Sequence, residues 1–314
     1  LDAVVAIGYG TVRKRDLTTA VSTVSTEDTK LRPVTEASGF IQGKVAGVTV
    51  QQTSGLPGAG MTVRVRGASS IASSNDPLYV VDGVPVGTGN YAIAYLSPQD
   101  IETMQILKDA SSAAIYGSRA ANGVVLITTK QGKKSRGPQI NFNASVGLSN
   151  VAKTYEVLNT AEYMDLMNEI GMVKFPEGVE LKDETDWFKE TYRTGINQNY
   201  QISVANASDK MRYYLGAGYS DEQGVLPVAY NKRFNIKANF DADLFDWISA
   251  GVNVAYSSYK NNGIISGTGS NRAGVVLSVI NTPTYAKVWS DENPNWYWNS
   301  FYGANLSTPI ENMA

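Results

Sequence analysis

Hydrophobic and polar positions follow two different patterns on either side of residue 132. Before it, short apolar runs alternate with Gly-rich turns and with brief stretches that favour a helix. After the polar segment QGKKSRGP (131–138), apolar and polar residues alternate with a period of about two, as in ISAGVNVAYSSY (248–259). The first pattern predicts a small mixed α+β domain, and the second predicts an antiparallel sheet.

The elements expected in the N-terminal part are short. A helix is expected over residues 33–47, with Thr35 as its N-cap and Gly47 at its end. Gly117 is expected to end a second helix, and the Asp82-Gly83 pair to form a tight turn. The core contacts expected from the first helix are Phe40, Ile41 and Val45. The other expected elements are strands at 48–52, 61–67, 78–84, 103–108 and 123–129, and a helix at 110–116.

Several segments of the C-terminal part place apolar side chains on one face and polar side chains on the other. They are residues 140–149, 200–205, 211–220, 234–243 and 248–259. The alternation fits a soluble sheet that covers a core, and it also fits a barrel wall that faces lipid. Short turns at 206–210 and 244–247, opposed to long connections at 150–198 and after 260, favour the barrel. A closed single-chain barrel needs roughly eight strands, so these segments predict only part of one.

The composition removes most kinds of enzyme chemistry. The chain has no His and no Cys, which excludes thiol nucleophiles, imidazole bases and Ser-His-Asp triads. The pair Asp241 and Asp243 suits a hydrated face better than glycoside hydrolysis. The formal net charge of −2 offers no basic field for nucleic acid. We therefore expect no enzymatic activity, no metal or other cofactor, and no nucleic-acid partner.

Two arginines in MTVRVRG (61–67) stand out because a strand would project both from one face. They are Arg64 and Arg66. A guanidinium keeps its charge and needs a partner when it is buried. The spacing alone leaves open a solvated edge or a pairing with carboxylates of a surrounding wall.

The order of the motifs resembles a known family. The motifs are VVAIGYG (4–10), FIQGKVAGVTVQQTSGLPG (40–58), NDPLYVVDGVP (75–85) and KDASSAAIYGSRAANGVVLITTK (108–130). Together they resemble the plug domain of the SusC-like (SusC/RagA) TonB-dependent outer-membrane transporters of the Bacteroidetes. The remaining residues, including NTAEYMDLMNE (159–169), resemble the start of the barrel in that family.

This resemblance implies a fold and a location. The expected fold is an α+β plug domain followed by the first antiparallel strands of a transmembrane β-barrel of about 22 strands. The expected location is the outer membrane of a Gram-negative cell. The chain would divide into a TonB-box-like segment (1–10), a plug domain (11–132) and an N-terminal portion of the barrel with extracellular loops (138–314).

The resemblance also implies a function and partners. We expect active import of oligomeric nutrients, either glycans or peptides, driven by TonB with ExbB and ExbD. A SusD-like surface lipoprotein would cover the substrate as a lid, and outer-membrane lipid would surround the barrel. The alternative is a non-transport structural or interaction subunit of a larger outer-membrane assembly.

Three groups of residues carry roles by resemblance. TonB would bind one segment by strand addition, although that segment also fits a first strand that never leaves the plug. Arg64 and Arg66 would lock the plug against barrel carboxylates. The TonB-binding segment is Val4, Val5, Ala6, Ile7, Gly8, Tyr9 and Gly10. The substrate-facing plug tips are Ser73, Ser74, Asn75, Asp76, Asn90 and Tyr91.

Overall fold

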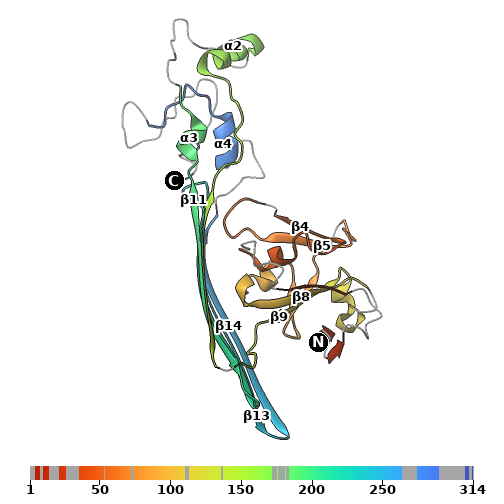
Figure 1. Cartoon of the computed structure of the whole chain (residues 1–314). Helices are drawn as coiled ribbons and strands as arrows, with labels where there is room; N and C mark the ends of the chain where they lie inside the picture. Colours follow the sequence, from red (N-terminus) through yellow and green to blue (C-terminus); the bar gives the residue numbers. More distant parts are fainter. Residues whose placement is uncertain are drawn as a thin grey trace. The chain divides into compact units, whose positions relative to one another are not determined.

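The computed structural model forms two compact units (Figure 1). Unit 1 comprises Leu1–Val146, Gln198–Asp221 and Lys232–Lys260, and unit 2 comprises Gly147–Asn197, Glu222–Asn231 and Asn261–Ala314. The structure describes residues 4–7, 10–13, 21–25, 35–52, 54–71, 74–109, 113–135, 137–171, 175, 181, 184–263, 274–289, 308–310 and 313.

A 5-stranded mixed sheet organises the N-terminal domain, the part of unit 1 that precedes the segment 131–138. Its strand order is β3 (Val21–Ser25), β8 (Ile101–Leu107), β9 (Val124–Thr129), β6 (Leu78–Val81) and β7 (Val84–Thr88). Strands β6 and β9 run parallel, and the other neighbours are antiparallel. Two separate hairpins pair β4 (Val48–Gln52) with β5 (Met61–Val65), and β1 (Val4–Ile7) with β2 (Gly10–Arg13). The 3-10 helices are η3 (Ala37–Ile41), η4 (Asn90–Ile93), η5 (Pro98–Asp100) and η6 (Ala114–Ala120).

The central strands of this sheet are apolar on both faces. Strand β6 reads LYVV and β9 begins VVLI, and all of these residues are buried. Because side chains alternate along a strand, Tyr79 and Val81 enter one core cluster while Leu78 and Val80 enter another. The sheet is therefore covered on both faces, as continuous apolar runs predict.

A second sheet of five strands, called the wall sheet, follows the N-terminal domain along the chain (Figure 1). Its strands lie in sequence order: β10 (Gln139–Ser149), β11 (Gly195–Ala207), β12 (Met211–Gln223), β13 (Tyr230–Phe245) and β14 (Ile248–Asn262). Short turns join β11 to β12 and β13 to β14, as the sequence predicts. The strands continue beyond the alternating segments, because regular hydrogen bonding needs no strict alternation at strand ends.

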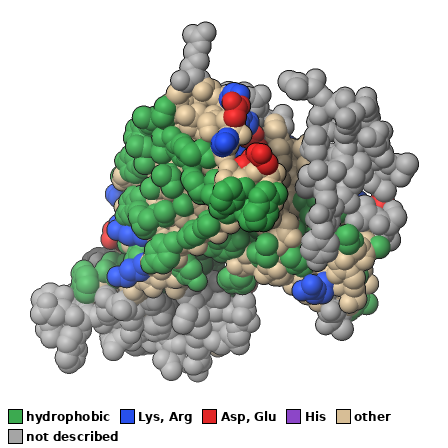
Figure 2. Space-filling view, turned by 90° about the horizontal axis from the view of Figure 1, so that it is seen from below, with side chains coloured by type: hydrophobic (Ala, Val, Ile, Leu, Met, Phe, Trp, Pro, Cys, Tyr) green, Lys and Arg blue, Asp and Glu red, His purple; other side chains and the backbone are tan. Residues whose placement is uncertain are grey.

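The two faces of the wall sheet reverse the usual burial of polar and apolar side chains. Phe142 and Val252 are 67% and 59% exposed, whereas Asn235 and Lys237 are only 5% and 3% exposed. Figure 2 shows hydrophobic side chains gathered over a broad area of the described surface, with few charged side chains among them. A soluble sheet would bury the apolar face, so this alternative is wrong. The arrangement is typical of a wall that meets hydrocarbon outside and polar groups inside.

Unit 2 gathers the long connections of the wall sheet around three helices. These are α2 (Thr160–Ile170), α3 (Trp187–Thr191) and α4 (Val275–Asn281). Asn159 and Glu162 form a capping box that fixes the start of α2. The buried Trp187 packs with Val279 and donates its indole N–H to the Pro283 carbonyl at 3.0 Å. These loops therefore have a core of their own.

None of the helices in the described part of the chain is both long enough and apolar enough to cross a membrane.

Three local predictions for the N-terminal domain meet different outcomes. The tight turn is confirmed, because Asp82 and Gly83 have φ values of 48° and 86° between β6 and β7. Thr35 as an N-cap is wrong, since η3 starts after Glu36 and has no side-chain cap. Gly117 is confirmed as the residue where the helical stretch before it ends, because its φ of 68° is not helical and kinks η6, a conformation that glycine adopts at little cost. The predicted core residues Phe40, Ile41 and Val45 are buried.

A charge introduced deep in the wall should cost much more than the same charge at its rim. Leu215 and Met211 lie on the apolar face of β12, and Met211 is the first residue after the short turn. We expect Leu215→Arg to lower the free energy of unfolding by about 2–4 kcal/mol and Met211→Arg by about 0–1 kcal/mol. Guanidinium titrations in lipid vesicles measure both values. Equal losses would contradict a lipid-facing wall.

Candidate functional site

The inner face of the wall sheet holds the N-terminal domain through hydrogen bonds. Asp100, the last residue of η5, is 2% exposed. Its Oδ1 accepts hydrogen bonds from Gln201 Nε2 at 2.6 Å and from the Tyr214 hydroxyl at 2.8 Å. Its Oδ2 accepts one from Asn235 Nδ2 at 3.3 Å. These donors come from β11, β12 and β13, so one carboxylate ties three wall strands to the domain.

Burial raises the pKa of the Asp100 carboxyl above its ordinary value, because desolvation penalises the charged form. The hydrogen bond from Tyr214, the charge of Lys130, the hydrogen bond from Gln201 and the charge of Lys237 act in the opposite direction and offset part of this effect. Asp100 is therefore held mainly by neutral donors in a dry site.

A second carboxylate, Asp82, lies in the turn between β6 and β7. It accepts hydrogen bonds from the Thr129 N–H at 2.8 Å and the Thr129 hydroxyl at 2.6 Å. From the wall, Asn253 Nδ2 donates to Asp82 Oδ2 at 2.7 Å, and Lys237 Nζ lies 3.4 Å from the same oxygen. The Lys237 side chain is 4% exposed and also donates to Asn253 Oδ1. This carboxylate, unlike Asp100, contacts a cation of the wall directly.

Strand β13 supplies several of the wall's contacts through alternate residues. Arg233 Nη2 donates to the Thr35 carbonyl at 3.1 Å. Asn239 Nδ2 donates to the Lys130 carbonyl at 2.8 Å and to the Thr129 hydroxyl at 3.2 Å. The buried inward-facing residues of β13 are Asn231, Arg233, Asn235, Lys237 and Asn239. Such a surface can hold a polar domain through hydrogen bonds.

The two predicted lock arginines do not project together from one strand. Strand β5 ends at Val65, and Arg66 follows it with φ 61°, a left-handed conformation that redirects its side chain. Arg64 forms an ion pair with Asp76, and Arg66 forms one with Asp109. Among the described residues, both of these ion pairs stay within the N-terminal domain. A lock against barrel carboxylates stays a prediction.

The structure brings the predicted tip residues together in two adjacent loops, except Ser73, which lies outside the described residues. Asn75 Oδ1 accepts the Ser69 and Ser70 N–H groups at 2.7 and 2.8 Å and so fixes the first loop. Asp76 lies beside Gly89 in the second loop, where an added Cβ would be 3.3 Å from its Oδ2.

At the start of η4, directly after the second of these loops, Asn90 accepts a hydrogen bond from the Ser38 hydroxyl at 2.8 Å. The neighbouring Tyr91 is 95% exposed. The tips are therefore held in place and carry an open aromatic side chain, and their contact with substrate stays a prediction.

The predicted TonB-binding segment forms a hairpin. Val4–Ile7 pairs antiparallel with Gly10–Arg13, with Val4 opposite Arg13 and Ile7 opposite Gly10. Gly8 and Tyr9 lie outside the described residues. Binding of TonB to this segment by strand addition stays a prediction.

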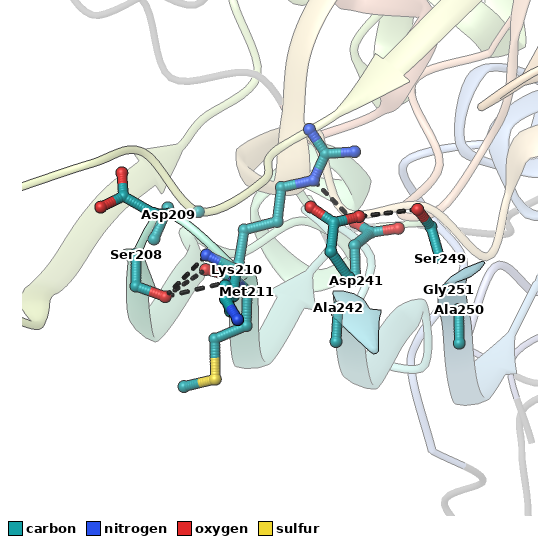
Figure 3. A pocket seen from close by; sticks show the side chains of 13 residues that line it. Ser208, Asp209, Lys210, Met211, Asp241, Ala242, Ser249, Ala250 and Gly251 are labelled. Atoms are coloured by element: carbon teal, nitrogen blue, oxygen red, sulfur yellow. Dashed lines mark hydrogen bonds and ion pairs between the residues drawn. The ribbon is translucent and has the colours of Figure 1, made fainter. Parts of the chain in front are cut away.

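A shallow cavity of about 490 Å³ lies at the short-turn end of the wall sheet (Figure 3). Arg212 Nε contacts Asp241 Oδ2 at 3.0 Å, and the Ser249 hydroxyl donates to Asp243 Oδ1 at 2.6 Å. These contacts join neighbouring strands of the wall, so the charged groups that make them stabilise the sheet. In the part of the chain that the structure describes, no cluster of acidic residues suits a metal ion.

The segment that leads from β9 to β10 is fitted tightly against the wall near this cavity. A Cβ on Gly132 would overlap the Asn206 carbonyl oxygen and lie 2.6 Å from that of Tyr213. The backbone of Lys134 forms an isolated parallel β-bridge with that of Ala207, and its side chain forms an ion pair with Asp209. The chain therefore passes from domain to wall along a fixed path.

Comparisons with known proteins agree with this geometry. Residues 13–124 match the TonB-dependent Receptor Plug Domain family. The chain is 38% identical over 322 residues to TonB-dependent receptor P26 of Formosa agariphila, covering 100% of this chain and 32% of the relative. It is 34% identical over 319 residues to TonB-dependent receptor SusC of Bacteroides thetaiotaomicron, covering 99% of this chain and 31% of the relative. It thus spans about a third of the length of these relatives.

Among solved structures, the chain is similar to the RagAB peptide importer in its open-open state. The TM-score is 0.83 with 29% sequence identity, over 98% of this chain and 38% of the other. This chain belongs to the SusC-like TonB-dependent receptors. Its N-terminal domain is the plug, and the wall sheet is part of the outer-membrane β-barrel. The boundaries expected at residues 10, 132 and 138 stay predictions.

Sequence reasoning missed the residues that hold the plug of this SusC-like receptor. Asp82 was expected only as a turn residue, and the sequence around Asp100 gave no indication that this residue contacts the wall. Lys237 did carry one, because it lies on the polar face of a predicted wall strand between Asn235 and Asn239. A cation that points into a lumen calls for a carboxylate on the plug.

The raised pKa of Asp100 gives the plug–wall contact a pH dependence. In the unfolded chain the carboxyl ionises near its ordinary value, whereas in the folded protein it keeps its proton to a higher pH. Stability is therefore lost as pH rises from the unfolded pKa to the folded pKa. We expect this loss in wild type and a flatter profile in Asp100→Asn, measured as the thermal midpoint across that pH range. Parallel profiles for the two proteins would contradict the assignment.

Gly132 is expected to tolerate no side chain. Gly132→Ala should destabilise the folded protein by about 1–3 kcal/mol, because the methyl group meets two backbone carbonyls that belong to a regular hairpin. Gly137→Ala is the matched control, since nothing lies within 4 Å of its Cβ position. Thermal unfolding of the two variants measures the difference. A similar midpoint for both would show that the connection is not fitted against the wall.

Proposed function

We propose that this chain is the plug and the first part of the barrel of an active importer of oligomeric nutrients. One observation carries the proposal: a polar domain is hydrogen-bonded to the inner face of a sheet whose outer face suits lipid. A lumen filled in this way excludes free diffusion, and passage then requires the plug to change its contacts. TonB, with ExbB and ExbD, supplies the energy for that change.

Glycan oligomers are the first candidate substrates and peptides the second. The resemblance of the motifs to the SusC-like family implies the first, and similarity to the RagAB peptide importer supports the second. A SusD-like surface lipoprotein is the proposed lid. It would dock at the end of the barrel that carries the long segments flanking the wall strands, of which the described part includes the helices α2, α3 and α4.

The N-terminal hairpin is the proposed handle for TonB. Strand addition uses main-chain hydrogen bonds, so it needs free N–H and C=O groups more than particular side chains. The sequence VVAI of β1 fits this requirement, because it has strong strand preference and no charged or chemically distinctive side chain. TonB would take the place of β2 along β1 and then pull on the plug.

Blocking strand addition should abolish import. We expect deletion of residues 4–10, and the single change Ile7→Pro, to lower uptake at least about tenfold, because proline removes an N–H donor from the strand. Ile7→Ala is the control and should keep uptake, since it keeps the backbone groups. Growth on single oligosaccharides or on a peptide digest identifies a substrate first, and uptake of its labelled form then compares the variants.

The same variants separate transport from the alternative role as a structural subunit. A structural subunit needs no TonB, so deletion of residues 4–10 would leave its outer-membrane complexes and its cellular phenotype intact. Full uptake in both the deletion and the proline variant, at normal outer-membrane abundance, would refute TonB-driven import through this segment.

A further inference from the structure

We propose that Asp82, Lys237 and Asn253 form a pin that keeps the exit end of the plug, where β9 leaves for the wall, seated on the barrel. The three residues position the plug for transport, and the charge of the Asp82–Lys237 pair carries the effect. This inference deepens the proposed function, although the seating of the plug is measurable without any import.

The place of Asp82 in the fold makes it suited to this role. Its φ of 48° is unusual for a residue other than glycine, and asparagine would suit the turn as well. Its carboxylate nevertheless accepts hydrogen bonds from Thr129 on the plug and from Asn253 on the wall. A single side chain thereby joins the β6–β7 turn, the end of β9 and two wall strands. The turn alone explains none of these contacts.

An ion pair distinguishes this pin from the contacts of Asp100. The Lys237 side chain is 4% exposed and that of Asp82 is 15% exposed, so water compensates little for a missing partner. Removal of one member of a buried pair leaves the other charge uncompensated, which destabilises far more than the loss of a neutral hydrogen bond. Asp100 is held by three neutral wall donors. The two carboxylates therefore differ in kind.

The surroundings of the pin connect it to the path of the chain. Asn239 donates to the Thr129 hydroxyl and to the Lys130 carbonyl, directly beside Asp82. Lys130 N–H in turn donates to the Asp100 carbonyl at 2.8 Å. The next residues follow the tight course set by Gly132. Loss of the pin would loosen the plug at the point where it is closest to the wall along the chain.

Leakage through the barrel tests the pin. The gene is altered in cells that make the protein at its natural length and lack TonB, and the minimal inhibitory concentration of vancomycin reports an unplugged barrel. We expect Asp82→Asn and Lys237→Met each to lower that concentration about tenfold, because each leaves one buried charge unpaired. Asp82→Asn preserves the turn, and Lys237→Met preserves side-chain length, so each change removes mainly a charge.

The double variant gives the decisive comparison. Asp82→Asn with Lys237→Met leaves no unpaired charge, so we expect it to leak clearly less than the product of the single effects. Asp100→Asn should leak less than Asp82→Asn, because it removes no ion pair. Arg212→Gln is the matched control. It breaks an ion pair between two wall strands, with Asp241, and should not change the vancomycin value.

The outcomes separate this inference from the proposed function. Single variants that stay as tight as wild type at equal outer-membrane abundance would overturn the pin, and so would a double variant whose leak equals the product of the singles. If the single variants fail to reach the membrane, outer-membrane abundance gives the same test: the double variant should recover it, because it leaves no unpaired charge, and an equally depleted double variant would overturn the pin. If the wild-type protein imports no oligomer while the Asp82→Asn variant leaks, only the transport proposal is refuted.

Discussion

Alternation along a strand that faces lipid on one side governs this molecule. Side chains point to opposite faces with a period of two, so a wall strand that offers apolar groups to hydrocarbon has its polar groups on the inner face. Those inner groups are buried as soon as a domain covers them, and buried polar groups need partners. The outer face thus fixes the chemistry of the inner one. A plug that fits such a wall has to be polar at its surface.

The contacts between plug and wall follow from this constraint. Asn235, Lys237 and Asn239 on β13 alternate with apolar residues such as Ile236 and Phe240 that point outward. Each inward residue finds a carboxylate, a hydroxyl or a carbonyl of the plug. Many hydrogen bonds of modest net strength make the interface specific, and they can exchange with water when it opens. An apolar interface would lack this exchange and would compete with the lipid-facing surface.

The sequence predicted the parts of the fold that depend on pattern. The wall strands followed from strict alternation, the Asp82-Gly83 turn from local chemistry, and the core of η3 from Phe40, Ile41 and Val45. A local detail that depends on tertiary contacts was missed, namely the uncapped start of η3 after Glu36. The wall's hold on the plug was missed for a similar reason: Asp82 and Lys237 are 155 residues apart. Only the folded chain shows that this turn residue and this strand residue form an ion pair.

The division of the plug sheet between two cores has a consequence for sequence change in this protein. Leu78 and Val80 serve one core, and Tyr79 and Val81 serve the other, so inserting or deleting one residue in β6 would exchange both sets at once. The outer face of the wall needs only apolar side chains, and many residues of different shape provide them. Divergence between relatives should therefore accumulate on the lipid side of the barrel, while the interior strands of the plug keep both their length and their order of side chains.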